Sequence, residues 1–349
     1  MLVDEATGEE RWAVQAHAGT NSSTVVAMSP SGRFVASMGM VEENWKLWEA
    51  TSGAAWMAGA RHDGTGACIC GATRRDCLSW QEGCPVVAHT GGLRALAFSP
   101  CGQRLASGDR AGAVILWDTQ TGEAEQRMQT GSEPVCSLSF SGDGARLASG
   151  SGIGSIRVWN TTSGALLRTL QAPEAWVFTV HFSPTDNRIL AVMACGTLTL
   201  WDVDSGEVMR SFAGSDSAVF SPDGRTIATA SADEREVLLI DVESGALRST
   251  LFGHQRCVLA LSFSGGDGGR LASVSFDGTC KVWDSSTGAL LRTVELGTDV
   301  AEAVSWGRDW VRDTHTGVAF AMGHHPRLGE TSEVLALDAG VVRMILDRV

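Results

Sequence analysis

The chain has 349 residues, of which 44% are apolar and 19% are charged, and its formal net charge is −13. A chain of this length and composition can form one large repeat domain, and its acidic field argues against direct binding of nucleic acid or of anionic membranes. We find no apolar run near the ~18 residues of a membrane span and no charged-then-apolar leader, so we expect an intracellular protein, cytoplasmic or nuclear. The nine scattered cysteines favour free thiols in a reducing compartment over a disulfide framework.

Two phrases recur along the chain at a spacing of about 42 residues, with two longer gaps. The first phrase is Trp-Asp-x-x-Thr-Gly or a degenerate copy of it. It occurs at residues 3–9, 48–54, 117–123, 159–165, 201–207, 240–246, 283–289 and 337–340. The second is a pair of apolar runs around a Pro, Gly or Asp turn, at residues 25–37, 95–107, 137–149, 179–191, 217–229 and 260–273. Such periodicity predicts one small structural unit per repeat.

Each repeat is predicted to form four short strands joined by hairpins. Pro presets the backbone and Gly permits the left-handed conformation that tight turns require. The strand runs are nearly continuous in apolar residues, as at 113–117, so both faces of each sheet must be covered. Because sheets stacked face to face around an axis satisfy that need, the predicted fold class is all-β, a closed ring of four-stranded antiparallel sheets.

These phrases resemble those of the WD40-repeat family, whose signature is Gly-His, then Asp in a tight turn, then Trp-Asp. The sixth repeat carries the whole signature, at Gly253, His254, Asp277, Trp283 and Asp284. The resemblance implies a seven-bladed β-propeller formed by residues 1–349 as one domain. It also implies that a strand within residues 1–17 completes the last blade, where a second strand near the C-terminus competes for the same edge. The start in mid-repeat leaves open that the chain is a fragment of a longer protein.

The same resemblance implies a structural hydrogen-bond tetrad formed by His254, Ser273, Asp277 and Trp283. A buried imidazole and a buried carboxylate must be paired. A Ser, a His and an Asp could also form a nucleophilic triad, but we favour the structural role. The sequence predicts an incomplete tetrad in other repeats. The second repeat keeps His89, Ser107 and Trp117 but has Ala111 where Asp is expected. Repeats three to five lack the His, and Ile240 replaces the Trp of the fifth repeat.

The longest gap between repeats contains a cysteine-rich insertion at residues 61–88, between the first and second blades. Its cysteines are Cys68, Cys70, Cys77 and Cys84. Four thiolates could hold zinc in a tetrahedral site, but the spacing differs from that of paired Cys-x2-Cys knuckles. We therefore favour an irregular loop with incidental thiols, and we expect no metal and no cofactor.

The favoured function is that of a non-catalytic scaffold or adaptor that binds protein or peptide partners in a multiprotein complex, with no small-molecule substrate. Its predicted partner-binding face lies on the loops at one end of the sheets and comprises Arg110, Ile153, Trp176, Arg256 and Phe276. One alternative is a propeller enzyme, because Asp4, Gly8 and Trp12 resemble a tryptophan-docking repeat of quinoprotein dehydrogenases. Another is a subunit of a ribonucleoprotein or nucleic-acid assembly.

Overall fold

The computed structural model describes residues 2–3, 10–12, 24–31, 33–39, 44–49, 52, 55–59, 89, 91–172, 176–193, 196–214, 217–231, 233–264 and 268–295. All regular structure in this part of the chain is β, with twenty-six strands and no helix. Six four-stranded antiparallel sheets follow one another in the sequence. The predicted all-β class is therefore confirmed.

Each sheet consists of four consecutive strands in sequence order. The first two sheets comprise β3 (Thr24–Met28), β4 (Phe34–Gly39), β5 (Asn44–Glu49) and β6 (Ala55–Gly59), then β7 (Leu93–Phe98), β8 (Arg104–Asp109), β9 (Ala113–Asp118) and β10 (Ala124–Gln129). The third and fourth comprise β11 (Val135–Phe140), β12 (Arg146–Ser151), β13 (Ser155–Asn160) and β14 (Leu166–Gln171), then β15 (Val177–Phe182), β16 (Arg188–Met193), β17 (Thr197–Asp202) and β18 (Val208–Ala213). The fifth and sixth comprise β19 (Ala218–Phe220), β20 (Thr226–Ala230), β21 (Val237–Asp241) and β22 (Leu247–Leu251), then β23 (Val258–Phe263), β24 (Arg270–Ser275), β25 (Thr279–Asp284) and β26 (Leu290–Glu295).

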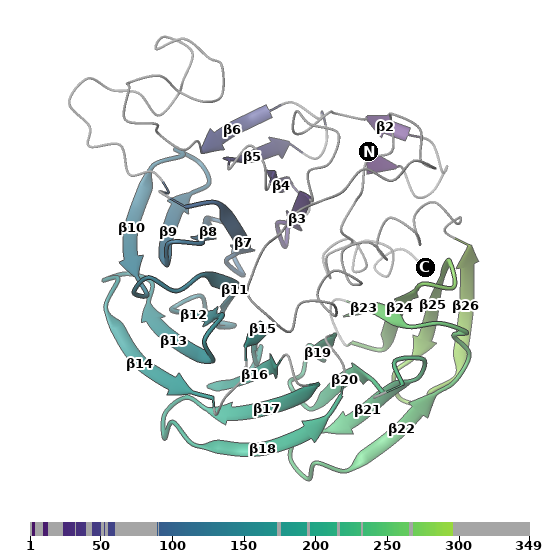
Figure 1. The fold of residues 1–349 in the computed structure, drawn as a ribbon. Coiled ribbons are helices and arrows are strands. Elements are labelled where there is room, and N and C mark those ends of the chain that lie inside the picture. Colours follow the sequence, from purple (N-terminus) through teal and green to yellow (C-terminus); the bar gives the residue numbers. More distant parts are fainter. Residues whose placement is uncertain are drawn as a thin grey trace, which may run out of the picture.

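The six sheets lie side by side around a common centre (Figure 1). The first strand of each sheet is near the centre and the fourth strand is at the periphery, as β11 and β14 show in the third sheet. Neighbouring inner strands are also joined directly: Ser137 and Ser139 on β11 accept hydrogen bonds from the amides of Val180 (3.1 Å) and Phe182 (3.0 Å) on β15. This arrangement places the turns at the two ends of the sheets.

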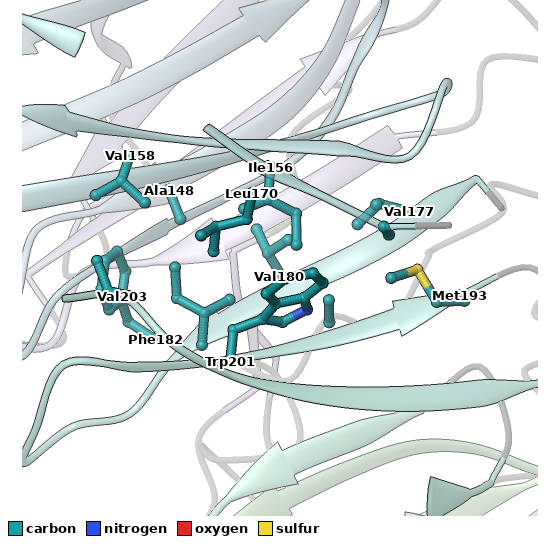
Figure 2. Close-up of a cluster of buried hydrophobic side chains, with 13 residues drawn as sticks. Ala148, Ile156, Val158, Leu170, Val177, Val180, Phe182, Met193, Trp201 and Val203 are labelled. Atoms are coloured by element: carbon teal, nitrogen blue, oxygen red, sulfur yellow. The ribbon is translucent and has the colours of Figure 1, made fainter. Parts of the chain in front are cut away.

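The apolar cores lie between neighbouring sheets, which is why the strand runs are apolar on both faces. On β9, Val114 and Leu116 pack toward the third sheet, whereas Ile115 packs toward the first. Figure 2 shows the core between the third and fourth sheets, where Ile156 and Leu170 lie close to the ring of Trp201. Because full burial of such a side chain stabilises the fold by about 1.5–3 kcal/mol, every sheet depends on its neighbours.

The Trp-Asp-x-x-Thr-Gly phrase forms the turn between the third and fourth strands of each sheet. In the second sheet, Asp118 accepts hydrogen bonds from the amides of Gln120 and Thr121, both at 2.7 Å. Gly122 closes the turn with a φ of 74°, a conformation that favours glycine. The glycine of the phrase is therefore a turn residue, as predicted, and the acidic residue at the end of the third strand holds the turn through its side chain.

Several predictions about the ends of the chain fall outside the described residues. At the N-terminus β1 (Leu2–Val3) pairs with β2 (Glu10–Trp12) in a separate two-stranded sheet, around the first copy of the phrase. The remainder of residues 1–17, which were predicted to complete the last blade, lies outside the described residues. The strands expected within 301–349 and the cysteine-rich insertion at 61–88 lie outside them as well. Within that part, no helix is long and apolar enough to cross a membrane.

Candidate functional site

The sixth sheet contains a buried network of four side chains from four segments of the chain. His254 lies in the connection from β22 to β23, Ser273 on β24, Asp277 in the turn after β24, and Trp283 on β25. His254 Nδ1 is 2.9 Å from Asp277 Oδ2, and His254 Nε2 is 2.7 Å from Ser273 Oγ. Trp283 Nε1 donates to the same Ser273 oxygen at 2.8 Å. The structure thus brings together all four residues proposed as the tetrad.

The hydrogen-bond partners fix the protonation state of this network. Because an ionised carboxylate only accepts, His254 Nδ1 carries the proton, and Nε2 accepts from the hydroxyl of Ser273. Burial lowers the pKa of His254, although the neighbouring Asp277 opposes this effect. Burial would raise the pKa of Asp277, but hydrogen bonds from Thr279, the Gln255 amide and His254 lower it to about 2. The network is therefore a neutral imidazole held by a carboxylate.

The second sheet contains an equivalent network, which the sequence comparison of repeats missed. His89 Nδ1 is 2.9 Å from Asp109 Oδ2, His89 Nε2 is 2.6 Å from Ser107 Oγ, and Trp117 Nε1 donates to that oxygen at 2.7 Å. Asp109 is at the end of β8, two residues before Ala111, where the acid was expected. The prediction of an incomplete tetrad in this repeat was therefore wrong, because Asp109 reaches the same imidazole from a different backbone position.

Other sheets also satisfy the indole N–H of their tryptophan. Trp48 donates to Ser37 at 2.8 Å and Trp159 donates to Ser149 at 2.9 Å. In the fourth sheet, Ala191 is at the position of that serine, and Trp201 instead donates to Thr199 on its own strand at 3.0 Å. The indole–hydroxyl bond is thus the most persistent part of the tetrad.

The Ser–His–Asp arrangement does not have the access that nucleophilic catalysis requires. Ser273 and Ser107 are fully buried, and each hydroxyl oxygen already accepts a tryptophan N–H. A nucleophile must be reachable by the substrate and close to a second group that stabilises the oxyanion. These two serines can therefore stabilise the sheets but cannot attack a bound substrate in this conformation.

No metal site can be built from the residues that the structure describes, because no group of three or more His, Cys, Asp or Glu side chains lies together there. The four cysteines considered as zinc ligands, Cys68, Cys70, Cys77 and Cys84, lie outside these residues. Of the described cysteines, Cys280 is buried, and burial raises its pKa to about 11. That thiol is a core group and a poor metal ligand.

The five residues predicted for the partner-binding face all lie at the same end of the sheets, distributed over the second, third, fourth and sixth sheets. Arg110 and Ile153 lie in turns between second and third strands, and Trp176 directly precedes an inner strand. Ile153 is 56% exposed, and the ring of Trp176 lies over Gly152 in the adjacent turn, since a Cβ there would be 3.1 Å from its Nε1. These three belong to successive sheets around the ring.

Arg256 and Phe276, by contrast, are in contact at the end of the sixth sheet. The guanidinium carbon of Arg256 is 5.7 Å from the centre of the Phe276 ring. Phe276 is buried, so it supports Arg256 rather than offering a surface of its own. Phe252 in the same loop is 67% exposed. Phe252 was not among the predicted site residues, because a single Phe in a loop carries no periodic signal.

Comparisons with known proteins agree with this architecture. A family model described as "WD domain, G-beta repeat" matches residues 83–118, 124–160, 164–202 and 245–284. Each of the last three matches begins at or just before the outer strand of one sheet and ends on the third strand of the next. Each sequence repeat therefore supplies the outer strand of one sheet and the first three strands of the next sheet.

Curated relatives are similar over about a quarter of the chain. WD repeat-containing protein 1 of Xenopus tropicalis is 35% identical over 98 residues, which are 26% of this chain and 16% of the relative. The COMPASS component SWD3 of Saccharomyces cerevisiae is 36% identical over 85 residues, or 24% of this chain and 26% of the relative. The Periodic tryptophan protein 2 homolog of Schizosaccharomyces pombe is 35% identical over 80 residues, or 23% of this chain and 9% of the relative. The chain thus spans only a minor part of each of these relatives.

The recurring phrases, the ring of four-stranded sheets and the buried tryptophan networks agree with the four matched repeats. The chain belongs to the WD40-repeat family.

Proposed function

We propose that this chain is a non-catalytic scaffold that holds protein partners in a multiprotein complex, and that it binds them at the end of the sheets where Arg110, Ile153, Trp176 and Arg256 lie. The observation that most supports this proposal is that the apolar faces of the described sheets are buried against one another. The turns and the outer strands of a rigid frame remain available for recognition, which suits binding more than catalysis.

The chemistry of the buried networks supports the absence of catalysis. Their histidines and carboxylates are already paired with each other and with a fully buried serine. Fold by itself does not determine function, so the proposal depends on these contacts rather than on family membership.

The relatives support a role within an assembly. SWD3 is by name a component of COMPASS. We propose that this chain also acts as one subunit among several, in an intracellular complex whose other members are proteins. Direct binding of nucleic acid is not part of the proposal, because the chain carries a net charge of −13.

Affinity purification with variants at the two ends of the sheets tests the proposed function. The wild-type chain should co-purify with stoichiometric protein subunits from an extract of its own cells. The double variant I153E/R256E should lose them, because it places new acidic groups on the proposed face. The control is the double variant T162E/R292E, which changes the net charge by the same amount. Thr162 lies in the turn at the opposite end of the third sheet, and Arg292 lies on the outer strand β26. This control should retain the protein subunits.

The result that would contradict the proposal is a chain that purifies alone from its own cells. Equal loss of subunits in both double variants would contradict the assignment of the face. A redox cofactor bound at stoichiometric amounts would favour an enzyme instead.

A further inference from the structure

The loop that enters the sixth sheet is held in place by several hydrogen bonds. Residues 254–257 are tied to the turn 275–277 by a series of hydrogen bonds: His254 to Asp277, the Gln255 amide to Asp277 at 2.9 Å, Ser275 Oγ to the Arg256 carbonyl at 2.9 Å, and the Phe276 amide to the Cys257 carbonyl at 3.0 Å. A loop tied in this way presents its exposed side chains in a fixed arrangement, which lowers the entropic cost of binding.

Arg256 is exposed on this loop with part of its guanidinium already positioned. Its Nη1 donates to the carbonyl of Phe276 at 3.2 Å, and the group lies over the Phe276 ring. Among the described residues, Nε and Nη2 have no hydrogen-bond partner, and no carboxylate lies within ion-pair distance of Arg256. Arg157 in the third sheet differs, because Glu133 pairs with it at 3.0 Å. The remaining edge of the Arg256 guanidinium has the fork geometry that binds a carboxylate through two hydrogen bonds.

Phe252 supplies an apolar surface at the other end of the same loop. It directly follows β22, and its side chain is the most exposed of the large apolar side chains in the described residues, at 67%. Since the connection runs from the peripheral strand β22 to the central strand β23, Phe252 lies toward the rim and Arg256 toward the centre. An aromatic ring and a preorganised arginine are the side chains that most often anchor protein interfaces.

We propose that Phe252 and Arg256 together form a docking site for an acidic segment of a protein partner, in which a carboxylate binds Arg256 and a neighbouring apolar side chain covers Phe252. This site rests on the proposed scaffold function and specifies the chemistry of one partner segment. Charge complementarity supports an acidic occupant: the site presents a cation without an acidic partner among the described residues, on a chain that is otherwise strongly acidic.

Fluorescence polarisation with labelled synthetic peptides of about ten residues tests the site. A peptide that alternates Glu and Leu should bind the wild-type chain, and R256Q or F252S should each weaken that binding about 5–10-fold, as expected when one charge-assisted contact or one aromatic anchor is lost. R292Q is the matched control, because Arg292 is an exposed arginine of the same sheet and its loss changes the net charge equally; it should change the affinity less than twofold. Thermal unfolding of each variant verifies that the fold is retained.

Three results of the peptide measurements would overturn the site. The first is a wild-type chain that does not bind the Glu-Leu peptide or binds a Lys-Leu peptide equally well. The second is a loss of affinity in R292Q equal to that in R256Q, which would indicate non-specific charge attraction. The third is equal binding of a Glu-Gly peptide, which would remove the role of Phe252. If subunits captured by the wild-type chain are also retained by R256Q, this site fails while the proposed scaffold function stands.

Discussion

At the scale of single residues, the clearest constraint is that a buried indole N–H needs an acceptor. An unsatisfied buried donor costs about 1–3 kcal/mol, and the structure meets the need with a serine from the neighbouring strand in most sheets. In the fourth sheet Thr199 replaces that serine. The acceptor is thus retained even where its position in the repeat changes.

Asp109 provides a test of the same idea for the carboxylate. D109S should destabilise the fold by about 1–3 kcal/mol, because His89 and the amides of Ala111 and Ala113 lose a buried acceptor. The double variant D109S/A111D should recover much of this loss, since it recreates the spacing found at Ser275 and Asp277 in the sixth sheet. Chemical denaturation of the three proteins measures both effects. A double variant no more stable than D109S would contradict the equivalence of the two networks.

His181 on the inner strand β15 makes the stability of the fold depend on pH. Burial lowers its pKa to about 4, below the ordinary value near 6.5. The unfolded chain therefore binds more protons between these values, and stability must fall as the pH decreases through this window. The side chain keeps some exposure, so we expect His181 to account for about 1–2 kcal/mol of the loss between pH 7 and pH 5.

Comparison with H181Q isolates this contribution. Urea denaturation at pH 7 and pH 5 should show a smaller pH-dependent loss in H181Q than in the wild-type chain. The carboxylates of Asp109 and Asp277 do not interfere, because their pKa values are lowered and they stay ionised in this range. An identical loss in both proteins would show that His181 does not titrate as described.

These residues also show how far the sequence can predict the structure. Where a repeat has them, the positions of Trp, Ser and the turn Gly could be read from the sequence, because strands and hairpins impose a fixed residue spacing. Asp109 and Thr199 could not, because a side chain reaches its partner through space from a neighbouring position. The contact of Arg256 with Phe276 joins two loops, and its geometry likewise has no sequence signal.

At the scale of strands and turns, neighbouring sheets are joined by arginines at the end opposite the proposed face. Arg146 and Arg168 of the third sheet bond the side chain and the backbone of Asp204 in the fourth, at 3.2 and 2.6 Å. Arg188 and Arg210 of the fourth sheet bond Glu243 of the fifth in the same way, at 3.1 and 2.6 Å. Each such turn is therefore held by two strands of the preceding sheet.

The glycine of the turn is required for this contact. Gly206 has a φ of 80°, and a Cβ there would lie 2.8 Å from Nη1 of Arg168. G206A should therefore destabilise the fold by about 1–3 kcal/mol, through backbone strain and displacement of the arginine. R168A alone should cost about 1 kcal/mol, because it loses hydrogen bonds to two carbonyls.

The double variant G206A/R168A separates the two causes. If the arginine contact matters, the combined loss should be smaller than the sum of the single losses, because the clash is absent once Arg168 is removed. Chemical denaturation of the four proteins gives this coupling. Strictly additive losses would indicate that Gly206 is needed only for its backbone conformation.

At the scale of the whole molecule, the second to fifth sheets are each covered on both faces by their neighbours, and this burial stabilises them. The sixth sheet follows this rule: Ala272, Cys280 and Val282 on its face away from the fifth sheet are fully buried. We propose that the complete ring has seven sheets, as the repeat pattern predicts, with residues 1–17 and 301–349 supplying the one that joins the sixth sheet to the first.

Distances between spin labels in equivalent turns test this claim most directly. Labels at residues 52, 163, 205 and 287 lie in the same turn of the first, third, fourth and sixth sheets, and a non-cysteine attachment avoids the nine cysteines. In a closed ring of seven, the 52–287 distance should be close to the 52–163 distance, and both should be shorter than the 52–205 distance. A 52–287 distance longer than the 52–205 distance would mean an open arc and would contradict the account.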